Sequence, residues 1–213
     1  MLALVFVVGQ VAAAAPAAQS TPTPGPSDAT YGRIDGDVSV VGGLGATVGP
    51  GGARATVDMR FRYLDTVGVY TSYEDASVFA SGAEPKRVAS VGLELRPLFL
   101  GRWLQGYEFG SPRVDLALDS FGLELGAIFA QPIGGSFAER PGMQAGLGLE
   151  LPVFARASGL WIGFHGGVRW SDAALGEGTV RGPTDRAGYL SITLAWHQFF
   201  GAHAVDFGDA RAK

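Results

Sequence analysis

The chain has 213 residues, enough for one domain with or without a leader. Its net charge of −4 gives no basic surface for nucleic acid, and the absence of cysteine excludes disulfides, Cys-ligated zinc and a thiol nucleophile. The chain is 47% hydrophobic with a mean hydropathy of +0.20, yet no apolar run beyond residue 15 is long enough for a transmembrane helix, a combination typical of a β-barrel.

The first 30 residues are expected to lie outside the fold. Residues 1–15 have the apolar core and small-residue end of a secretory signal, although the basic start is missing, and Ala15-Pro16-Ala17 fits a cleavage site. We therefore assign residues 1–17 to a signal peptide, with a buried first strand as the alternative. Residues 18–30 are rich in Pro, Thr and Ser and are predicted to be a disordered linker.

The phrase Gly-Leu-Glu-Leu occurs three times, at 92–95, 122–125 and 148–151. Its apolar and polar residues alternate with a period of two, which is typical of a strand with one apolar and one polar face. Two further strands are expected, one beginning near Tyr31 and one at Val67. The same alternation predicts six strands at 53–63, 87–97, 119–130, 142–153, 160–170 and 187–198.

The composition of the polar face indicates which side meets water. That face consists mostly of Gly, Ser, Thr and isolated charges, and the chain has only two lysines, whereas a soluble sheet usually protects its outer face with charge. We predict an all-β fold over residues 31–200: a transmembrane, antiparallel, up-and-down β-barrel of about eight strands with a polar, Glu/Arg-lined lumen. A soluble barrel is the alternative, and residues 201–213 are expected to form a polar C-terminal tail.

The connections are expected to alternate between two sides. With both chain ends in the periplasm, the extracellular loops are 45–52, 75–86, 131–142 and 171–185, and the periplasmic connections are 64–66, 98–117 and 155–159. Within the longest of these, Leu100, Trp103, Leu104 and Tyr107 have helical spacing. This spacing predicts an interfacial amphipathic helix over residues 98–107. An extended hairpin is the alternative.

This arrangement resembles the small eight-stranded outer-membrane barrels of Gram-negative bacteria. The last strand, YLSITLAWHQFF at 189–200, is similar to the C-terminal signal by which that family is recognised by the outer-membrane assembly machinery. The family's signal usually closes the chain, whereas a tail follows here. The resemblance implies an outer-membrane location, contact with membrane lipids and recognition by the assembly machinery through 189–200, and we expect a monomer.

An eight-stranded barrel is just wide enough for its own side chains to fill, so an open solute channel is not expected. We predict a structural or surface-interaction barrel, with a narrow ion or proton pore as the alternative and a lipid A-modifying enzyme as the second. His165, Ser171 and Asp172 are the best catalytic candidates. Barrel deacylases place a serine two residues after the histidine, but Gly167 stands there. No catalytic residue and no cofactor are therefore assigned.

Charged residues of the polar faces are predicted to meet at mid-depth in the lumen. Adjacent carboxylates in a poorly hydrated space need cations beside them. The expected ion-paired plug consists of Arg60, Arg62 and Arg96 with Glu94, Glu124 and Glu150, and His165 lies at similar depth. A divalent cation held by the glutamates is the alternative, but no metal is assigned because the arginines already neutralise them.

Tryptophans are predicted to mark the membrane edges, since one end of the indole is apolar and the other donates a hydrogen bond. Trp170 is expected at the extracellular edge, and Trp103 and Trp196 near the periplasmic edge.

Overall fold

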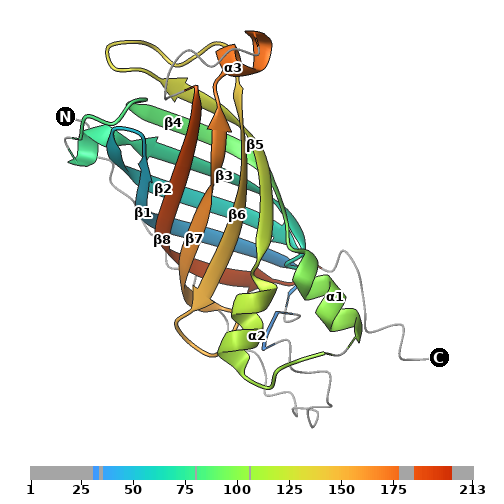
Figure 1. The fold of residues 1–213 in the computed structure, drawn as a ribbon. Helices are drawn as coiled ribbons and strands as arrows, with labels where there is room; N and C mark the ends of the chain where they lie inside the picture. The colour runs from blue at the N-terminus through green and yellow to red at the C-terminus, as the bar shows by residue number, and fades with distance from the viewer. Residues whose placement is uncertain (1–30, 34–35, 80, 106, 178–184, 203–213) are drawn as a thin grey trace.

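The computed structural model describes residues 31–33, 36–79, 81–105, 107–177 and 185–202. Eight antiparallel strands follow one another in sequence order and close into a barrel, as predicted (Figure 1). The strands are β1 Val38–Gly49, β2 Gly52–Tyr63, β3 Val67–Asp75, β4 Arg87–Leu95, β5 Gly122–Gln131, β6 Gly142–Pro152, β7 Gly159–Trp170 and β8 Arg186–Phe200. The predicted signal peptide, linker and cleavage site lie outside the described residues, as do residues 203–213 of the tail.

The largest differences from the predicted strand boundaries are in β1 and β5. β1 begins at Val38, not near Tyr31, and continues to Gly49, so that a turn at 50–51 replaces the expected loop 45–52. β5 begins at 122, not 119, because a helix occupies the preceding residues. Both differences arise at strand ends, where glycines and short apolar residues make the alternation ambiguous.

The two faces of the barrel have opposite chemistry. Leu44, Leu93 and Leu125 are 66%, 61% and 56% exposed on the outside. Residues of the opposite parity, such as Arg62 and Glu94, point inward and are buried. Period-two alternation along tilted strands therefore gives an apolar exterior around a polar lumen, the inverse of a water-soluble barrel and the arrangement of a transmembrane one.

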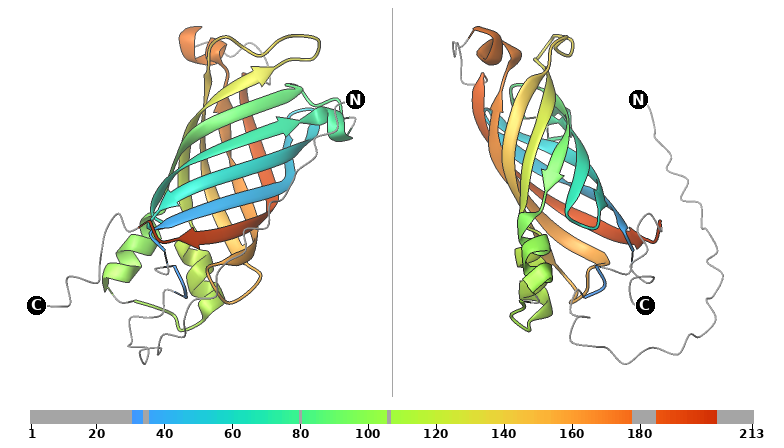
Figure 2. Two further views of the ribbon diagram at one scale, coloured as in Figure 1. Left: turned by 180° about the vertical axis from the view of Figure 1, so that it is seen from behind. Right: turned by 90° about the vertical axis from the view of Figure 1, so that its right-hand side faces the viewer.

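The connections alternate between the two ends of the barrel (Figure 2). We call the end that carries the connections 64–66, 96–121 and 153–158 the helix end, because two helices lie there. The opposite end, with the connections 50–51, 76–86, 132–141 and 171–185, is the loop end. It carries the short helices η1 Ala76–Phe79 and α3 Asp172–Glu177.

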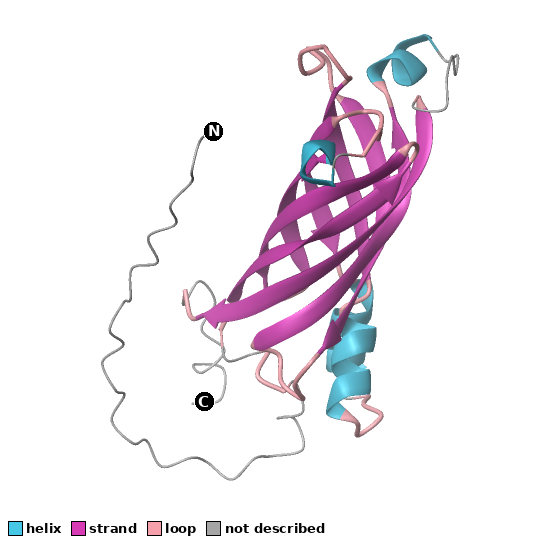
Figure 3. Cartoon of the chain, turned by 90° about the vertical axis from the view of Figure 1, so that its left-hand side faces the viewer, coloured by secondary structure: helices cyan, strands magenta, loops and turns pink. Residues whose placement is uncertain are grey.

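The connection between β4 and β5 is helical, so the predicted helix is confirmed and the hairpin alternative is wrong. It contains α1 Pro97–Gln105 and a second helix, α2 Pro112–Asp119, which the sequence analysis missed (Figure 3). Each helix begins at a proline, whose fixed φ and missing N–H suit the first helical position. At eight residues, α2 is too short for a clear helical periodicity.

Among the described residues, no helix is both long enough and apolar enough to cross a membrane.

A small apolar cluster closes the helix end. Leu116 of α2 packs with Ala157, Trp161 and Phe199, and Tyr31 packs against them. The indole N–H of Trp161 donates to the carbonyl of Ala157 at 2.9 Å. The barrel therefore has an apolar floor at the helix end, while the charged side chains lie above it in the lumen.

Candidate functional site

Charged and polar side chains are interspersed with glycines on the lumen face of the sheet. Direct cross-strand partners run Arg62, Gly68, Glu94, Glu124, Gly146 and Gly167 from β2 to β7. The next row toward the loop end runs Arg60, Tyr70, Gly92, Gly126, Gln144 and Arg169. Glycines beside long side chains leave the space that these need inside a narrow barrel.

Arg60 is the centre of the lumen network. Glu94 and Glu124 are directly opposed on β4 and β5, a pairing of like charges that is unfavourable on its own. The NH1 group of Arg60 lies between them, 3.1 Å from Glu94 Oε2 and 2.6 Å from Glu124 Oε1. Its Nε donates to Asp58 Oδ2 at 2.7 Å. One guanidinium therefore links three carboxylates.

Two further arginines extend the network toward the helix end. Arg62 donates to Glu94 Oε2 and to Glu150 Oε1, both at 2.9 Å. Arg96 donates to Glu94 Oε1 at 2.9 Å and also to Glu150 Oε2. The structure thus brings together all six side chains of the predicted Arg/Glu cluster, each buried.

Two histidines flank the cluster. His165 Nδ1 lies 2.8 Å from Glu124 Oε1 and 3.1 Å from Arg60 NH2, so it joins the network from β7. His197 was not assigned to the cluster from the sequence, yet its Nε2 lies 3.5 Å from Glu150 Oε2. Its ring stacks on Trp161 with centroids 4.6 Å apart, which places it between the network and the apolar floor.

Arg33 precedes β1 and connects the Arg/Glu cluster to the apolar floor at the helix end. It was not predicted from the sequence as a cluster residue. Its NH2 donates to the Leu116 carbonyl at 2.7 Å, and its side chain pairs with Asp65 at 3.4 Å and Asp119 at 3.2 Å. Burial lowers the pKa of the Arg33 guanidinium, and the two carboxylates partly offset this effect. Neither Arg33 nor Asp65 lies in a strand, so strand alternation could not place them.

Asp115 of α2 fixes the loop between the two helices. It accepts from the Phe109 N–H at 2.9 Å and from the guanidinium of Arg102, while the Tyr31 hydroxyl donates to it at 3.2 Å. Burial opposes ionisation of Asp115, but these donors outweigh it and hold its pKa below the ordinary value. α1 and α2 are therefore tied together by charge at the helix end.

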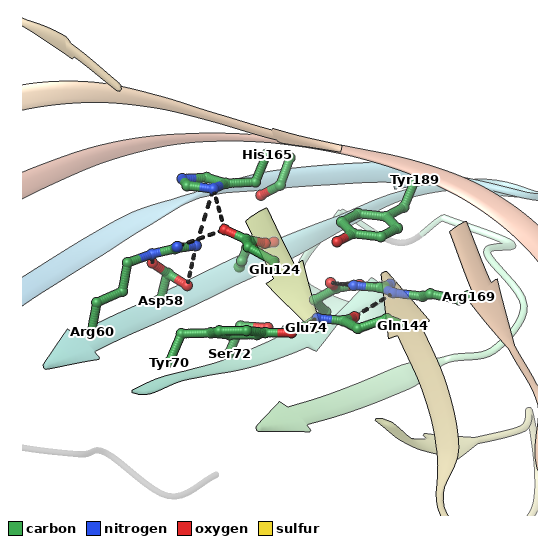
Figure 4. A pocket seen from close by; sticks show the side chains of 12 residues that line it. Asp58, Arg60, Tyr70, Ser72, Glu74, Glu124, Gln144, His165, Arg169 and Tyr189 are labelled. Atoms are coloured by element: carbon green, nitrogen blue, oxygen red, sulfur yellow. Dashed lines mark hydrogen bonds and ion pairs between the residues drawn. The ribbon is translucent and has the colours of Figure 1, made fainter. Parts of the chain in front are cut away.

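A second charged group lies nearer the loop end (Figure 4). Arg169 forms a two-pronged pair with Glu74, at 3.0 Å and 2.5 Å, and its Nε donates to Gln144 Oε1 at 3.0 Å. Gln144 in turn donates to the Tyr70 hydroxyl at 2.7 Å. Glu74 shares the parity of the lumen-facing residues of β3, so strand alternation alone could have identified it as a lumen residue.

A mid-lumen cavity separates the two charged groups. It is small, with a volume of about 20 Å³, and its walls include Asp58, Arg60, Glu124, His165 and Arg169 (Figure 4). Within the described part of the chain, no group of His, Asp and Glu side chains has a geometry that could hold a metal ion. The glutamates face arginines, which is the arrangement expected when guanidinium groups supply the neutralising charge.

The catalytic candidates do not form a triad. The hydroxyl of Ser171 donates to Asp185 Oδ1 at 2.7 Å at the loop end, whereas His165 bonds within the lumen to Glu124 and Arg60. A serine nucleophile needs a base within hydrogen-bond reach, and Ser171 is paired with an aspartate instead.

The predicted interface tryptophans occupy different positions. Trp170 is the last residue of β7, at the loop end, and is half-buried. Trp196 lies on the outer face of β8 toward the helix end and is 53% exposed. Trp103 belongs to α1, but its side chain lies outside the described residues. Their depth in a membrane stays a prediction.

A methyl group added inside the lumen should destabilise the barrel. A Cβ at Gly148 would lie 2.7 Å from His165 Nδ1 and 3.1 Å from Glu124 Oε1. We expect Gly148→Ala to cost about 1–3 kcal/mol in the free energy of unfolding, measured by urea titration in lipid, because the imidazole would have to leave its partners. Gly42→Ala is the control, since nothing lies within 4 Å of that Cβ. Equal midpoints for the two variants would contradict this packing.

No protein-family model matches the chain, and no curated protein matches it. Several solved structures are similar, among them the three that follow. The N-terminal β-barrel domain of Pseudomonas aeruginosa OprF has a TM-score of 0.42 and 9% identity, covering 76% of this chain and 98% of that one. Yersinia pestis Ail, in complex with a heparin analogue, has a TM-score of 0.33 and 14% identity, covering 76% and 96%.

Neisserial surface protein A has a TM-score of 0.31 and 13% identity, covering 75% of this chain and 94% of that one. With TM-scores below 0.5, these similarities add no argument about fold or function, and the fold assignment rests on the strand pairing and the facing of the side chains. On that ground, the chain is an eight-stranded, up-and-down β-barrel of the transmembrane type, with a lumen lined by glutamate and arginine.

Proposed function

We propose that the protein is an integral outer-membrane barrel whose lumen is plugged by its own side chains, and that its role is structural or surface-directed. The observation that carries the proposal is the Arg60-centred network, which connects β2, β4, β5 and β7 across the lumen. Side chains that bridge the lumen in this way would obstruct an aqueous path at their level.

The outer-membrane location is supported by the two faces of the sheet. Apolar side chains cover the outside along all eight strands, and β8 alternates exposed and buried residues without interruption over 189–200. This is the pattern expected of a strand recognised by the assembly machinery and then inserted into lipid. The helix end would face the periplasm, with α1 at the membrane interface, and the loop end would face outward.

A planar bilayer tests the plug directly. We expect the purified full-length chain to give no conductance steps above the lipid baseline, because the guanidinium–carboxylate network fills the lumen. A large open porin in the same bilayer serves as the positive control. Reproducible steps from the wild-type barrel, abolished by boiling the sample, would overturn the plugged-lumen proposal.

A narrow proton path is the second candidate, favoured by the polar walls of the mid-lumen cavity. Liposomes that contain the protein and a trapped pH-sensitive dye distinguish the two. The plugged barrel predicts dye responses equal to those of empty liposomes. A proton flux that is lost in Glu124→Gln but kept in the lipid-facing variant Leu125→Ala would favour the path.

A further inference from the structure

The connection between β6 and β7, residues 153–158, lies beside α2 at the helix end (Figure 1 and Figure 2). From α2, the NH2 group of Arg113 donates to the Val153 carbonyl at 3.3 Å. Within the connection, the Arg156 guanidinium lies over the Phe154 ring, 5.9 Å from its centroid. Two cations therefore contact the same short turn. We call Arg113, Phe154 and Arg156, which are all exposed, the turn patch.

The two arginines of the turn patch differ from most other arginines of the barrel. Carboxylates pair with eight of the other described arginines, which are Arg33, Arg54, Arg60, Arg62, Arg87, Arg96, Arg102 and Arg169. Within the described part of the chain, no carboxylate pairs with Arg113 or Arg156, whose contacts are a carbonyl and an aromatic ring. The turn patch therefore carries two positive charges that an external anion can neutralise.

The strand pairing places the turn patch just beyond the predicted interface tryptophan of β8. Trp196 pairs with Leu160 of β7, and the next residue along β7 pairs with Pro152, the last residue of β6. Phe154 follows two residues later. Interfacial tryptophans mark the boundary between hydrocarbon and headgroups. In the membrane position proposed above, the turn patch is therefore at the level of the headgroups.

We propose that the turn patch binds the negatively charged headgroup of a phospholipid in the leaflet at the helix end, an inference that rests on the proposed outer-membrane location. The phosphodiester would accept from Arg113 and Arg156, because a guanidinium presents a planar fork of donors that matches phosphate oxygens. Phe154, 49% exposed, and Val114, 47% exposed, would lie against the beginning of the acyl chains. A zwitterionic headgroup has its own cation beside the phosphate and would bind more weakly.

Quenching by brominated lipids tests the site locally. The probe is Phe154→Trp in a full-length chain whose four native tryptophans are changed to phenylalanine. Into phosphatidylcholine vesicles that contain this protein, phosphatidylglycerol or phosphatidylcholine with the same brominated chains is titrated, and unbrominated phosphatidylglycerol corrects for headgroup charge alone. We expect a relative binding constant of about fivefold or more in favour of phosphatidylglycerol, the effect of one arginine near an anionic lipid surface.

Charge variants in the same probe chain assign the preference to the arginines. Arg113→Gln/Arg156→Gln should be quenched equally by the two brominated lipids, because no cation of the turn patch then favours the anionic headgroup. Arg140→Gln is the matched control, since this arginine is also exposed but lies in the β5–β6 connection at the loop end. It should keep the full preference. Unboiled gel mobility reports that each variant is folded.

A chain that keeps Trp196 as its single tryptophan separates two kinds of failure. If Trp196 is quenched but the Phe154→Trp probe shows no preference for phosphatidylglycerol, the headgroup site is overturned while the membrane location stands, which is the result expected if the turn patch binds an acidic protein. A preference that survives Arg113→Gln/Arg156→Gln also overturns the site. No quenching of Trp196 by either lipid would overturn the membrane location and the headgroup site with it.

Urea unfolding provides a second measurement that leaves the native tryptophans in place. A lipid that binds only the folded barrel stabilises it. Replacing part of the phosphatidylcholine with phosphatidylglycerol should therefore raise the urea midpoint of the wild type and of Arg140→Gln more than that of Arg113→Gln/Arg156→Gln. Equal shifts in the three proteins would contradict the headgroup site.

Discussion

Arg60→Ala should destabilise the barrel by about 3–5 kcal/mol, the cost of removing one partner from a buried ion-pair network. The guanidinium lies between Glu94 and Glu124, which oppose each other across β4 and β5, and it also holds Asp58. Without it, three buried carboxylates lose a cation and two of them face each other directly. Urea unfolding in lipid or detergent micelles, followed by tryptophan fluorescence, measures the loss.

Matched variants separate this effect from a general loss of charge. Arg87→Ala removes a rim arginine that is 35% exposed and paired with Asp75 at 2.9 Å, and it should change the free energy of unfolding little, because exposed ion pairs are screened by solvent. Glu124→Gln should also destabilise, and the double variant Arg60→Ala/Glu124→Gln should lose less than the sum of the two single changes, because the residues share one interaction. If Arg60→Ala costs no more than Arg87→Ala, the lumen network contributes nothing to stability.

Leu125→Arg should cost about 2–4 kcal/mol, the penalty of a cation on the lipid face near the bilayer midplane. Leu125 is 56% exposed and follows Glu124, so the two side chains lie on opposite faces of the same strand. In a soluble barrel, an arginine at this exposed position would cost almost nothing. Folding yield into vesicles and the urea midpoint in lipid both report the penalty.

The control for this prediction is a similar change at the edge of the apolar belt. Val48 is 55% exposed and is the second-last residue of β1, at the loop end. Val48→Arg should cost about 0–1 kcal/mol, since the penalty falls toward the interface. Equal effects at the two positions would mean that the exposed apolar surface does not cross a membrane.

Strand alternation predicted most of the lumen residues because successive side chains along a barrel strand point alternately into the lumen and outward. Arg60, Glu94 and Glu124 could be placed inside from the residues beside them alone, and counting along the strands placed them at similar depth. The closed eight-stranded order and the helix after Pro97 also followed from the sequence. The direct pairing of Glu94 with Glu124 did not, because register depends on the tilt and shear of the closed barrel.

The lumen residues that were not predicted from the sequence lie mainly outside the strands, where side chains no longer alternate between two faces. Arg33 precedes the first strand, and Asp65 lies in the β2–β3 turn with φ of 50°. Asp65 pairs with Arg96 of the cluster at 3.3 Å, and Arg33 reaches the cluster only through Asp65. Glu74 is different: it is the second-last residue of β3 and has the parity of the lumen-facing residues, but its partner Arg169 lies on β7, far away in the sequence. His197 has the parity of the lumen-facing residues of β8, but its contact with Trp161 depends on the β7–β8 register.

The two tryptophans on the paired strands β7 and β8 provide the most direct test of the fold and its facing. Trp196 pairs across the sheet with Leu160, and the next residue, Trp161, lies at nearly the same height on the opposite face. Trp196 is 53% exposed and Trp161 is 1% exposed. Single-tryptophan variants, with the other three changed to phenylalanine, place one probe on each side of the same wall.

Quenching by brominated lipids in reconstituted bilayers then decides between the two faces. The transmembrane barrel predicts strong quenching of Trp196, strongest with bromines near the headgroups, and little quenching of Trp161 at any bromine depth. Strong quenching of Trp161 with none of Trp196, or no quenching of either in protein that remains in the aqueous phase, would contradict the apolar-outside, charged-inside barrel.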